Sequence, residues 1–176
     1  MSYSQPYNTV PTPGETPLWA PLYGANIKVA VQRVFKKYAT FSGRASLSEY
    51  WWWILVNFLV VLVLYIAMII GAVATATPSA SGYGTNPGPG GLVGGLLLLL
   101  WALAVVVPSL AVQARRLHDA NYSGWLILLG FVPFLGAIAV IILTAMPSNP
   151  AGQRFDEPGY QAGPGYPAPN YGQPTS

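Results

Sequence analysis

The chain has 176 residues, of which 53% are hydrophobic and only 7% charged, and its formal net charge is +3. A soluble domain carries about 25% charged residues, so most of the ordered surface of this chain cannot face water. The sequence contains no cysteine, which excludes disulfides, thiol catalysis and thiolate metal sites.

Residues 1–25 form a proline-rich arm that we expect to be disordered, because its prolines stand among Ser, Thr and Tyr without an apolar core. The arm also does not have the form of a cleavable signal peptide, so the first spanning helix would direct insertion. A proline-rich ligand for a partner domain is an alternative, but no basic residue flanks these prolines.

Residues 26–40 are predicted to form an amphipathic helix. Apolar residues recur with helical spacing at Ile27, Ala30, Val31, Val34, Phe35 and Tyr38. Polar and basic residues take the other face, namely Lys28, Gln32, Arg33, Lys36 and Lys37. Because a membrane span follows, we expect this helix to lie in the membrane interface, with its basic side toward anionic lipid headgroups. Nucleic-acid binding is not expected, since the chain has no recognition motif.

The first span is predicted over residues 51–74, an uncharged stretch long enough for the roughly 20 residues that cross a bilayer. Ser46 and Glu49 have the spacing of a capping box, which begins a helix. Aromatic residues follow at once and are expected at the lipid–water interface: Tyr50, Trp51, Trp52 and Trp53. Asn57 is the one strongly polar residue inside the span, and a hydrogen bond to a neighbouring helix is its expected role.

The loop at 76–91 has no charge and many helix-breaking residues, so it is predicted to be a flexible connection. A second span is predicted over 92–113, with a kink at Pro108. Arginine or aspartate at the bilayer centre costs about 2.5–3.5 kcal/mol. The charges that follow the span are therefore expected at the interface: Arg115, Arg116, His118 and Asp119. On a continuous helix, Asp119 would lie within ion-pairing distance of both arginines.

The third apolar segment covers 125–146 and is long enough for one crossing, with Trp125 at the interface. Gly130, Pro133 and Gly136 interrupt it, so a re-entrant hairpin is the alternative. Residues 151–176 are rich in Gly, Pro and Tyr and are expected to be disordered. The basic residues before the first span and after the second, with none in the 76–91 loop, predict a cytoplasmic N-terminus.

Three motifs of the chain together resemble the DUF805 family of small bacterial inner-membrane proteins of unknown role. The first block runs Phe41-Ser42-Gly43-Arg44-Ala45-Ser46 and continues with Glu49-Tyr50-Trp51-Trp52; the second is Arg115-Arg116-Leu117-His118-Asp119; the third is Ser123-Gly124-Trp125. The resemblance covers about residues 35–150, and it implies a membrane domain over 41–150 in the bacterial cytoplasmic membrane. The 76–91 loop and both tails depart from the family pattern. The family has no established activity, so the resemblance implies no mechanism.

The expected fold is an all-α membrane protein with about three transmembrane helices. Its expected role is that of a non-enzymatic scaffold or binding component in the lipid bilayer, with a membrane-protein partner or a second copy as a possible neighbour. A cytoplasmic-face polar network would join the spans, and its candidate residues are Arg44, Glu49, Arg115, Arg116, His118 and Asp119.

Two alternatives remain open from the sequence. His118 and Asp119 could serve a small-solute or ion transporter, because histidine titrates near neutrality; however, no ionisable group lies within the spans, where transport chemistry normally places one. A membrane enzyme with His118 as base is the second alternative, but no nucleophile stands out. One histidine with few carboxylates makes a poor metal site, so no catalytic residue, metal or cofactor is predicted.

Overall fold

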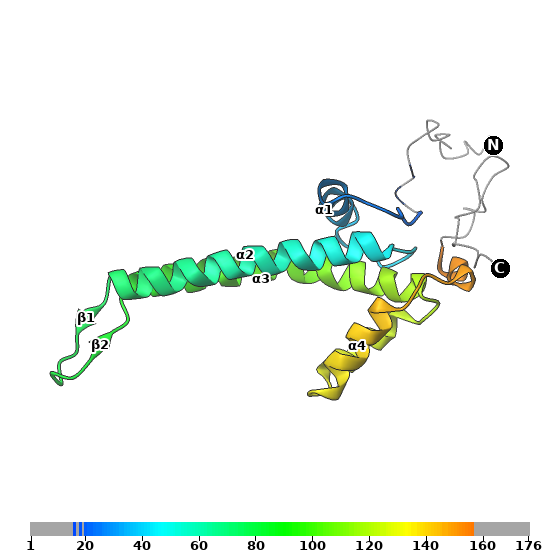
Figure 1. Cartoon of the computed structure of the whole chain (residues 1–176). Coiled ribbons are helices and arrows are strands. Elements are labelled where there is room, and N and C mark those ends of the chain that lie inside the picture. Colours follow the sequence, from blue (N-terminus) through cyan, green and yellow to red (C-terminus); the bar gives the residue numbers. More distant parts are fainter. Residues whose placement is uncertain (1–15, 17, 19, 157–176) are drawn as a thin grey trace, which may run out of the picture.

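The computed structural model describes residues 16, 18 and 20–156. The elements follow one another as α1 (Ile27–Lys36), α2 (Leu47–Ala74), β1 (Thr77–Pro78), β2 (Thr85–Asn86), α3 (Pro89–Asp119), η1 (Gly124–Phe131), α4 (Leu135–Ala145) and η2 (Pro150–Phe155). Two long helices, α2 and α3, lie side by side and form the axis of the molecule (Figure 1). The predicted disorder of residues 1–15, 17, 19 and 157–176 lies outside the described residues.

The start of α2 confirms the predicted capping box. The Ser46 hydroxyl accepts the Glu49 N–H at 3.2 Å, and the Glu49 carboxylate accepts the Ser46 N–H at 2.9 Å. These bonds satisfy two backbone donors that a helix otherwise leaves open. The 28 residues of α2 and the 31 of α3 give lengths of about 42 and 46 Å, at 1.5 Å per residue, enough to cross a hydrocarbon core of about 30 Å.

The surface of α2 and α3 is that of a membrane protein rather than a soluble core. None of the most apolar 18-residue stretch of α2 is buried, and only 22% of that of α3 is. The core helix of a soluble protein would hide such a stretch, whereas lipid accepts it. Asn57 accepts a hydrogen bond from the Trp101 indole N–H at 3.0 Å, so the predicted contact between the two helices is confirmed.

Near the loop, glycines let the two helices approach closely. A Cβ placed on Gly90 would lie 2.4 Å from the Gly71 carbonyl oxygen, and one on Gly94 would lie 2.5 Å from the Met68 Cα. The loop itself is shorter than predicted, because α3 begins at Pro89. Two short antiparallel strands, β1 and β2, pair within it. The helix pair therefore continues beyond the two predicted spans.

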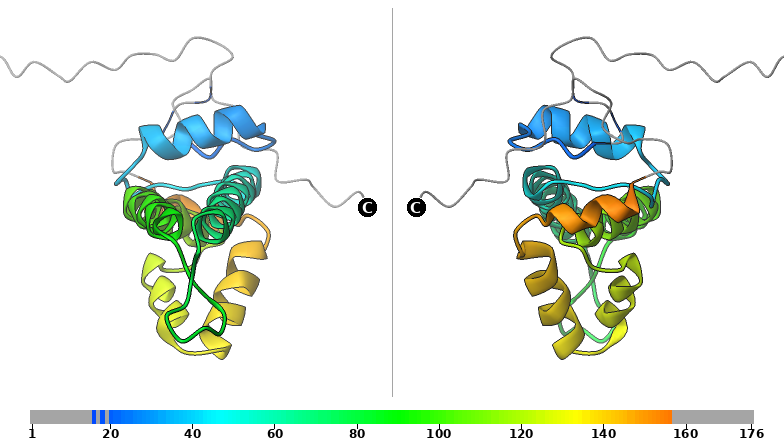
Figure 2. Two further views of the ribbon diagram at one scale, coloured as in Figure 1. Left: turned by 90° about the vertical axis from the view of Figure 1, so that its left-hand side faces the viewer. Right: turned by 90° about the vertical axis from the view of Figure 1, so that its right-hand side faces the viewer.

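Helix α1 crosses one face of the α2–α3 pair (Figure 2). Its face toward the pair carries Ala30, Arg33, Val34 and Lys37, all of them buried. The expectation that Arg33 and Lys37 would lie on the side of this helix that faces lipid headgroups was therefore wrong, because the protein encloses both side chains. The helix begins at Asn26, whose side chain accepts the Val29 N–H at 2.9 Å.

Tyr50 and Trp53 also depart from their predicted place at the lipid interface. Both are buried, and the Trp53 indole donates to the Ser109 hydroxyl at 3.1 Å. The Trp53 ring also meets the Phe35 ring edge-on, with centroids 5.5 Å apart. These two aromatic residues join Val34, Ala45, Val105 and Val112 in the core between α1, α2 and α3. Trp51, Trp52 and Trp125 are exposed.

The third apolar segment is helical, but the single crossing predicted over 125–146 is replaced by a hairpin of η1 and α4. The chain reverses at Phe134, whose φ is +60°. At the return, a Cβ on Gly136 would lie 1.7 Å from the Leu129 carbonyl oxygen, so only glycine fits there. With 11 residues, α4 is about 17 Å long and too short to cross a bilayer. The hairpin leaves the helix pair on the face opposite α1 (Figure 2).

The segments next to both predicted disordered tails are ordered in part. In the arm predicted as disordered over 1–25, the Leu22 N–H donates to Glu49 at 3.2 Å and the Ala25 N–H to Ser48 at 2.9 Å. In the tail predicted over 151–176, residues up to Phe155 form η2, and Asp156 pairs with Arg44. Both segments find polar partners at the same end of the helix pair, which overrides their low intrinsic tendency to fold.

Candidate functional site: a buried cluster of charges

The buried charges of the described chain gather at the end of α2–α3 that also carries α1 and η2 (Figure 1). They are Arg33, Lys37, Arg44, Glu49, Arg115, Arg116 and Asp119. A charge removed from water is costly unless another charge or a set of hydrogen bonds compensates it. The partners of each side chain therefore decide what the cluster does.

Glu49 joins α1 to the start of α2. One carboxylate oxygen accepts a short hydrogen bond from Nε of Arg33. The other accepts the backbone N–H groups of Ser46 at 2.9 Å and Leu22 at 3.2 Å. The remaining N–H groups of Arg33 donate to the carbonyls of Thr16, Leu18 and Ala20. This ion pair is thus fully enclosed by hydrogen bonds, the condition under which a buried pair is tolerated.

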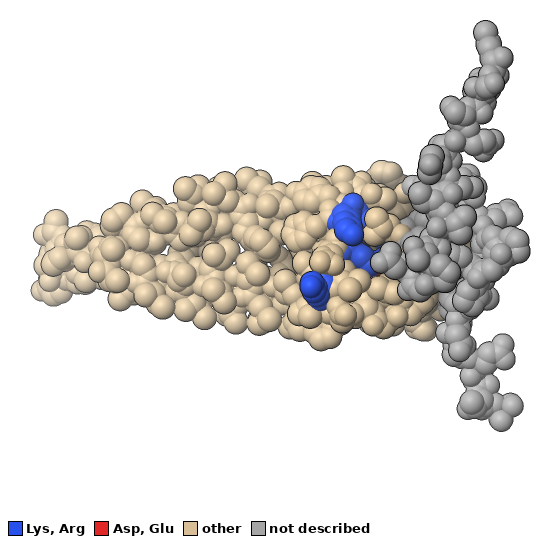
Figure 3. Space-filling view, turned by 90° about the horizontal axis from the view of Figure 1, so that it is seen from above, with Lys and Arg blue, Asp and Glu red and all other residues tan. Residues whose placement is uncertain are grey.

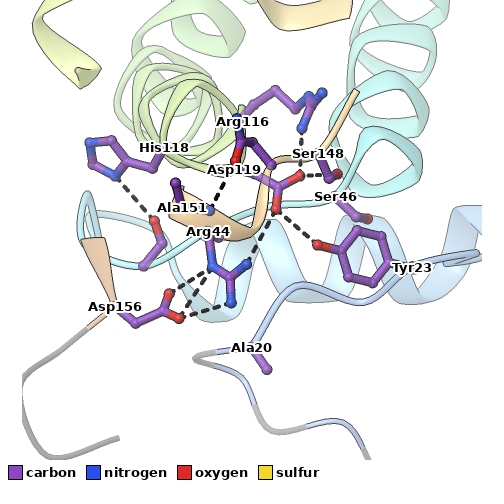
Figure 4. Close-up of polar contacts among 12 residues, drawn as sticks. Ala20, Tyr23, Arg44, Ser46, Arg116, His118, Asp119, Ser148, Ala151 and Asp156 are labelled. Atoms are coloured by element: carbon purple, nitrogen blue, oxygen red, sulfur yellow. Dashed lines mark hydrogen bonds and ion pairs between the residues drawn. The ribbon is translucent and has the colours of Figure 1, made fainter. Parts of the chain in front are cut away.

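Asp119 joins the end of α3 to the segments on either side of it (Figure 4). Its carboxylate accepts Nη1 of Arg116 at 2.5 Å, the Tyr23 hydroxyl at 3.0 Å and the Ser148 hydroxyl. Arg116 also donates to the carbonyl of Thr144 at 2.8 Å and to that of Met146. The last turn of α4 is therefore tied to the last turn of α3, so both ends of the hairpin lie at the charged end.

Arg44 links the connection between α1 and α2 to the end of η2. Its Nε lies 3.0 Å from Oδ1 of Asp156, and its Nη2 lies 2.9 Å from Oδ2. This two-pronged geometry is the stronger form of an arginine–carboxylate contact. Nη1 of Arg44 also lies 3.8 Å from Asp119 (Figure 4). The pair spans 112 residues of sequence and fastens the segment after the hairpin to the segment before α2.

His118 and Asp119 do not act on one another. The His118 Nδ1 lies 3.1 Å from the Gly43 carbonyl oxygen, and its ring stacks on Phe155 with centroids 4.2 Å apart. The guanidinium of Arg154 lies 4.6 Å from the centroid of the same Phe155 ring. The carboxylate of Asp119 is occupied as described above. Within the described part of the chain, no three metal-ligating residues come together.

Arg115 and Lys37 are the two buried cations without a carboxylate of their own. Nε of Arg115 donates to the Ala111 carbonyl at 3.1 Å, but its buried Nη2 has no hydrogen-bond partner in the described structure. The ion pairs of the described residues do not include Lys37. Burial, and then the charge of Arg115, lowers the pKa of Lys37 to about 7. Lys37 therefore lies close enough to Arg115 to be affected by its charge.

The six predicted network residues thus lie at one end of the molecule but form several separate contacts. Arg116 pairs with Asp119 three residues later, as predicted; Arg115, four residues before Asp119, does not pair with it. Sequence reasoning missed Arg33, Lys37, Tyr23 and Asp156. For Asp156 the sequence carried a usable signal, because the predicted network held three arginines against only two carboxylates, Glu49 and Asp119.

The chain is 33% identical over 123 residues to inner membrane protein YhaH of Escherichia coli, and the match covers 70% of this chain and 89% of the relative. It is 32% identical to inner membrane protein YhaI of the same organism, over 69% of this chain and 87% of the relative. No solved structure matches the chain.

The membrane relatives and the two long apolar helices together confirm the expected fold class, an all-α membrane protein. The family model described as "Protein of unknown function (DUF805)" matches residues 38–157, which include α2, α3, the hairpin and η2. The chain therefore belongs to the DUF805 family.

Proposed function

We propose that the protein is a non-enzymatic scaffold or binding component of the bacterial inner membrane. Its two long helices cross the bilayer, its short helical hairpin enters the bilayer and returns, and its charged end stands at the cytoplasmic surface. The observation that carries this proposal is the set of ion pairs made by the three carboxylates at this end. Glu49, Asp119 and Asp156 are each held by an arginine from another segment or turn, which suits a rigid fastening better than a reactive site.

The distribution of charge supports the orientation. The connection between α2 and α3 carries no charged residue, whereas basic residues surround the other end of both helices. Cytoplasmic segments of membrane proteins carry the excess of lysine and arginine. The names of the inner-membrane relatives support the same membrane for this chain.

Labelling of single cysteines with a membrane-impermeant maleimide on intact cells tests this topology, because the chain has no native cysteine. The exposed residues Ser81, Ser123 and Gln153 report the loop, the start of the hairpin and η2. We expect Ser81→Cys to react from outside, and Ser123→Cys and Gln153→Cys only after permeabilisation. Labelling of Ser123→Cys in intact cells would overturn the orientation. If Gln153→Cys reacts from outside while Ser123→Cys does not, the segment between them crosses the membrane a third time and does not form a hairpin.

No specific observation favours either alternative, the transporter or the membrane enzyme. A proton-carrying role for His118 and Asp119 needs side chains that face a common path, and these two contact different segments. A catalytic base needs a nucleophile or substrate within hydrogen-bonding reach. The His118 ring instead lies between the Gly43 carbonyl and the face of Phe155.

A further inference from the structure

The buried charges at the end of α2–α3 do not balance. The two carboxylates of the cluster and the neighbouring half-buried Asp156 each have an arginine: Glu49 has Arg33, Asp119 has Arg116 and Asp156 has Arg44. Lys37 and Arg115 are left over, and both are at most 5% exposed. Two buried cations close enough for one to lower the pKa of the other are unfavourable, unless Lys37 gives up its proton or a negative charge is supplied from elsewhere.

The carboxylate of Glu49 is close enough to affect both cations but cannot serve as their partner. Its charge raises the pKa of Lys37, opposing the effect of burial. Yet its two oxygens already accept Nε of Arg33 and the backbone N–H groups of Ser46 and Leu22. Lys37 and the outer nitrogens of Arg115 therefore lack an acceptor within the described chain, and Nη2 of Arg115 is buried without any hydrogen bond.

The donors of this pair match the oxygens of a phosphate group. An arginine guanidinium binds phosphate oxygens through its fork of N–H groups, and a lysine ammonium contributes a compact positive charge with three donors. The two residues come from different segments, the end of α1 and the last turns of α3. An anion between them would satisfy Nη2 of Arg115 and would neutralise the repulsion at the same time.

We propose that Lys37 and Arg115 form a binding site for a phosphate-type oxyanion, supplied by a phospholipid headgroup or by free phosphate. The site goes beyond the proposed scaffold role, which needs no ligand.

The surroundings of Lys37 fit a group at the membrane surface. Three neighbours in sequence are large, apolar and exposed, namely Phe35, Tyr38 and Phe41. The hydroxyl of Tyr38 reaches the Ala104 carbonyl at 2.5 Å, which holds this stretch against α3. Viewed from the side of α1, the blue lysine and arginine atoms gather in the half of the molecule that carries this helix, and the other half is tan (Figure 3).

The test measures thermal unfolding of the full chain in a neutral detergent, with two probes in separate arms. One arm adds inorganic phosphate, with chloride at equal ionic strength as reference. The other adds short-chain phosphatidylglycerol, with a phosphate-free diacylglycerol of the same chain length as reference. We expect at least one probe to raise Tm by about 5–10 °C at a hundredfold excess over its Kd. A response to the lipid alone identifies a headgroup site, whereas a response to phosphate identifies a site for the free anion.

Three variants decide whether the response belongs to this site. Lys37→Met, which keeps a long side chain at the end of α1, is expected to abolish the Tm shift, and Arg115→Gln to do the same if it folds. Lys36→Gln removes an equal charge from the exposed neighbouring position and should keep the full shift. The proposal is overturned if neither probe stabilises the parent protein, if Lys37→Met responds like the parent, or if Lys36→Gln loses the response equally. Detergent solution has no inside or outside, so these outcomes do not depend on the topology proposed above.

Discussion

At the charged end of α2 and α3, acid–base pairs tie together segments far apart in sequence, whereas at the loop end the two helices approach one another through glycines. Arg44 and Asp156 at the first end are 112 residues apart. At the second end, Gly71 and Gly90 bring the two backbones into contact, and many of the surrounding apolar side chains are exposed. Lipid is as apolar as leucine, so the loop end gains no hydrophobic driving force from packing. Directional contacts therefore specify the first end, and close steric fit specifies the second.

The largest expected effect comes from removing the carboxylate that joins most segments at the charged end. Asp119→Ala leaves Arg116 buried without its carboxylate and deprives Tyr23 and Ser148 of their acceptor. Breaking one side of a buried pair costs about 3–5 kcal/mol. We expect a large fall in Tm and in folded yield in detergent. Arg154→Gln, an exposed charge nearby, is the control and should change little; equal Tm values for the two variants would contradict a fastening role.

The loop end is tested by adding one methyl group at adjacent glycines. A Cβ on Gly94 would lie 2.5 Å from Met68 Cα, so Gly94→Ala should push the helices apart at a cost of about 1–3 kcal/mol. On Gly95 the nearest atom is the Met68 sulfur at 3.9 Å, an ordinary contact. Gly95→Ala should therefore be neutral or stabilising, since alanine favours a helix by about 1 kcal/mol over glycine. Thermal unfolding of the two variants measures the difference, and equal destabilisation would show that steric fit is not the cause.

A smaller effect, confined to the charged end, is a dependence of stability on pH. The pKa of Lys37 falls from 10.5 to about 7 on folding, through burial and the charge of Arg115, with Arg33 lowering it further and Glu49 and Asp156 opposing. Between these two values the unfolded chain holds a proton that the folded chain lacks, so the free energy of unfolding should rise with pH from about 7 upward. The slope is at most about 1.4 kcal/mol per pH unit.

Unfolding measured from pH 6 to 9 without phosphate or anionic lipid checks this dependence. Lys37→Met should flatten the rise, because the titrating group is gone, while the exposed Lys36→Gln should leave it in place. A profile that is identical in the parent and in Lys37→Met would assign the pH dependence to another group.

The contrast between directional polar contacts and close steric fit explains which features could be predicted from the sequence. The capping box of Ser46 and Glu49 and the contact of Asn57 were predictable because a polar group in an apolar setting must find a nearby partner. The ion pair of Arg116 and Asp119 was predictable because they lie three residues apart on one helix.

Other features were hidden because lipid and protein accept the same side chains. Trp53 suits an interfacial position and a core equally well by composition, and its packing beneath α1 decided between them. The segment 125–146 is long and apolar enough for one crossing; the contact between Gly136 and Leu129 that reverses it becomes visible only in three dimensions. The partner of Arg44 lies in a tail whose composition favours disorder, and no local pattern indicates that pairing.

The smallest expected effect lies between the two ends, where the Trp101 indole donates to Asn57. Hydrogen bonds between membrane helices contribute about 0.6 kcal/mol on average and rarely more than about 1.7 kcal/mol. Trp101→Phe keeps most of the aromatic area and removes the donor, so it should lower the stability by roughly this amount. Asn57→Leu removes the acceptor without leaving an unpaired polar group on α2. If the contact is direct, the double variant will be more stable than the sum of the single losses predicts, as measured by unfolding in detergent. If the stability losses of the two single variants simply add in the double variant, the middle of the α2–α3 pair, like the loop end, depends on steric fit alone.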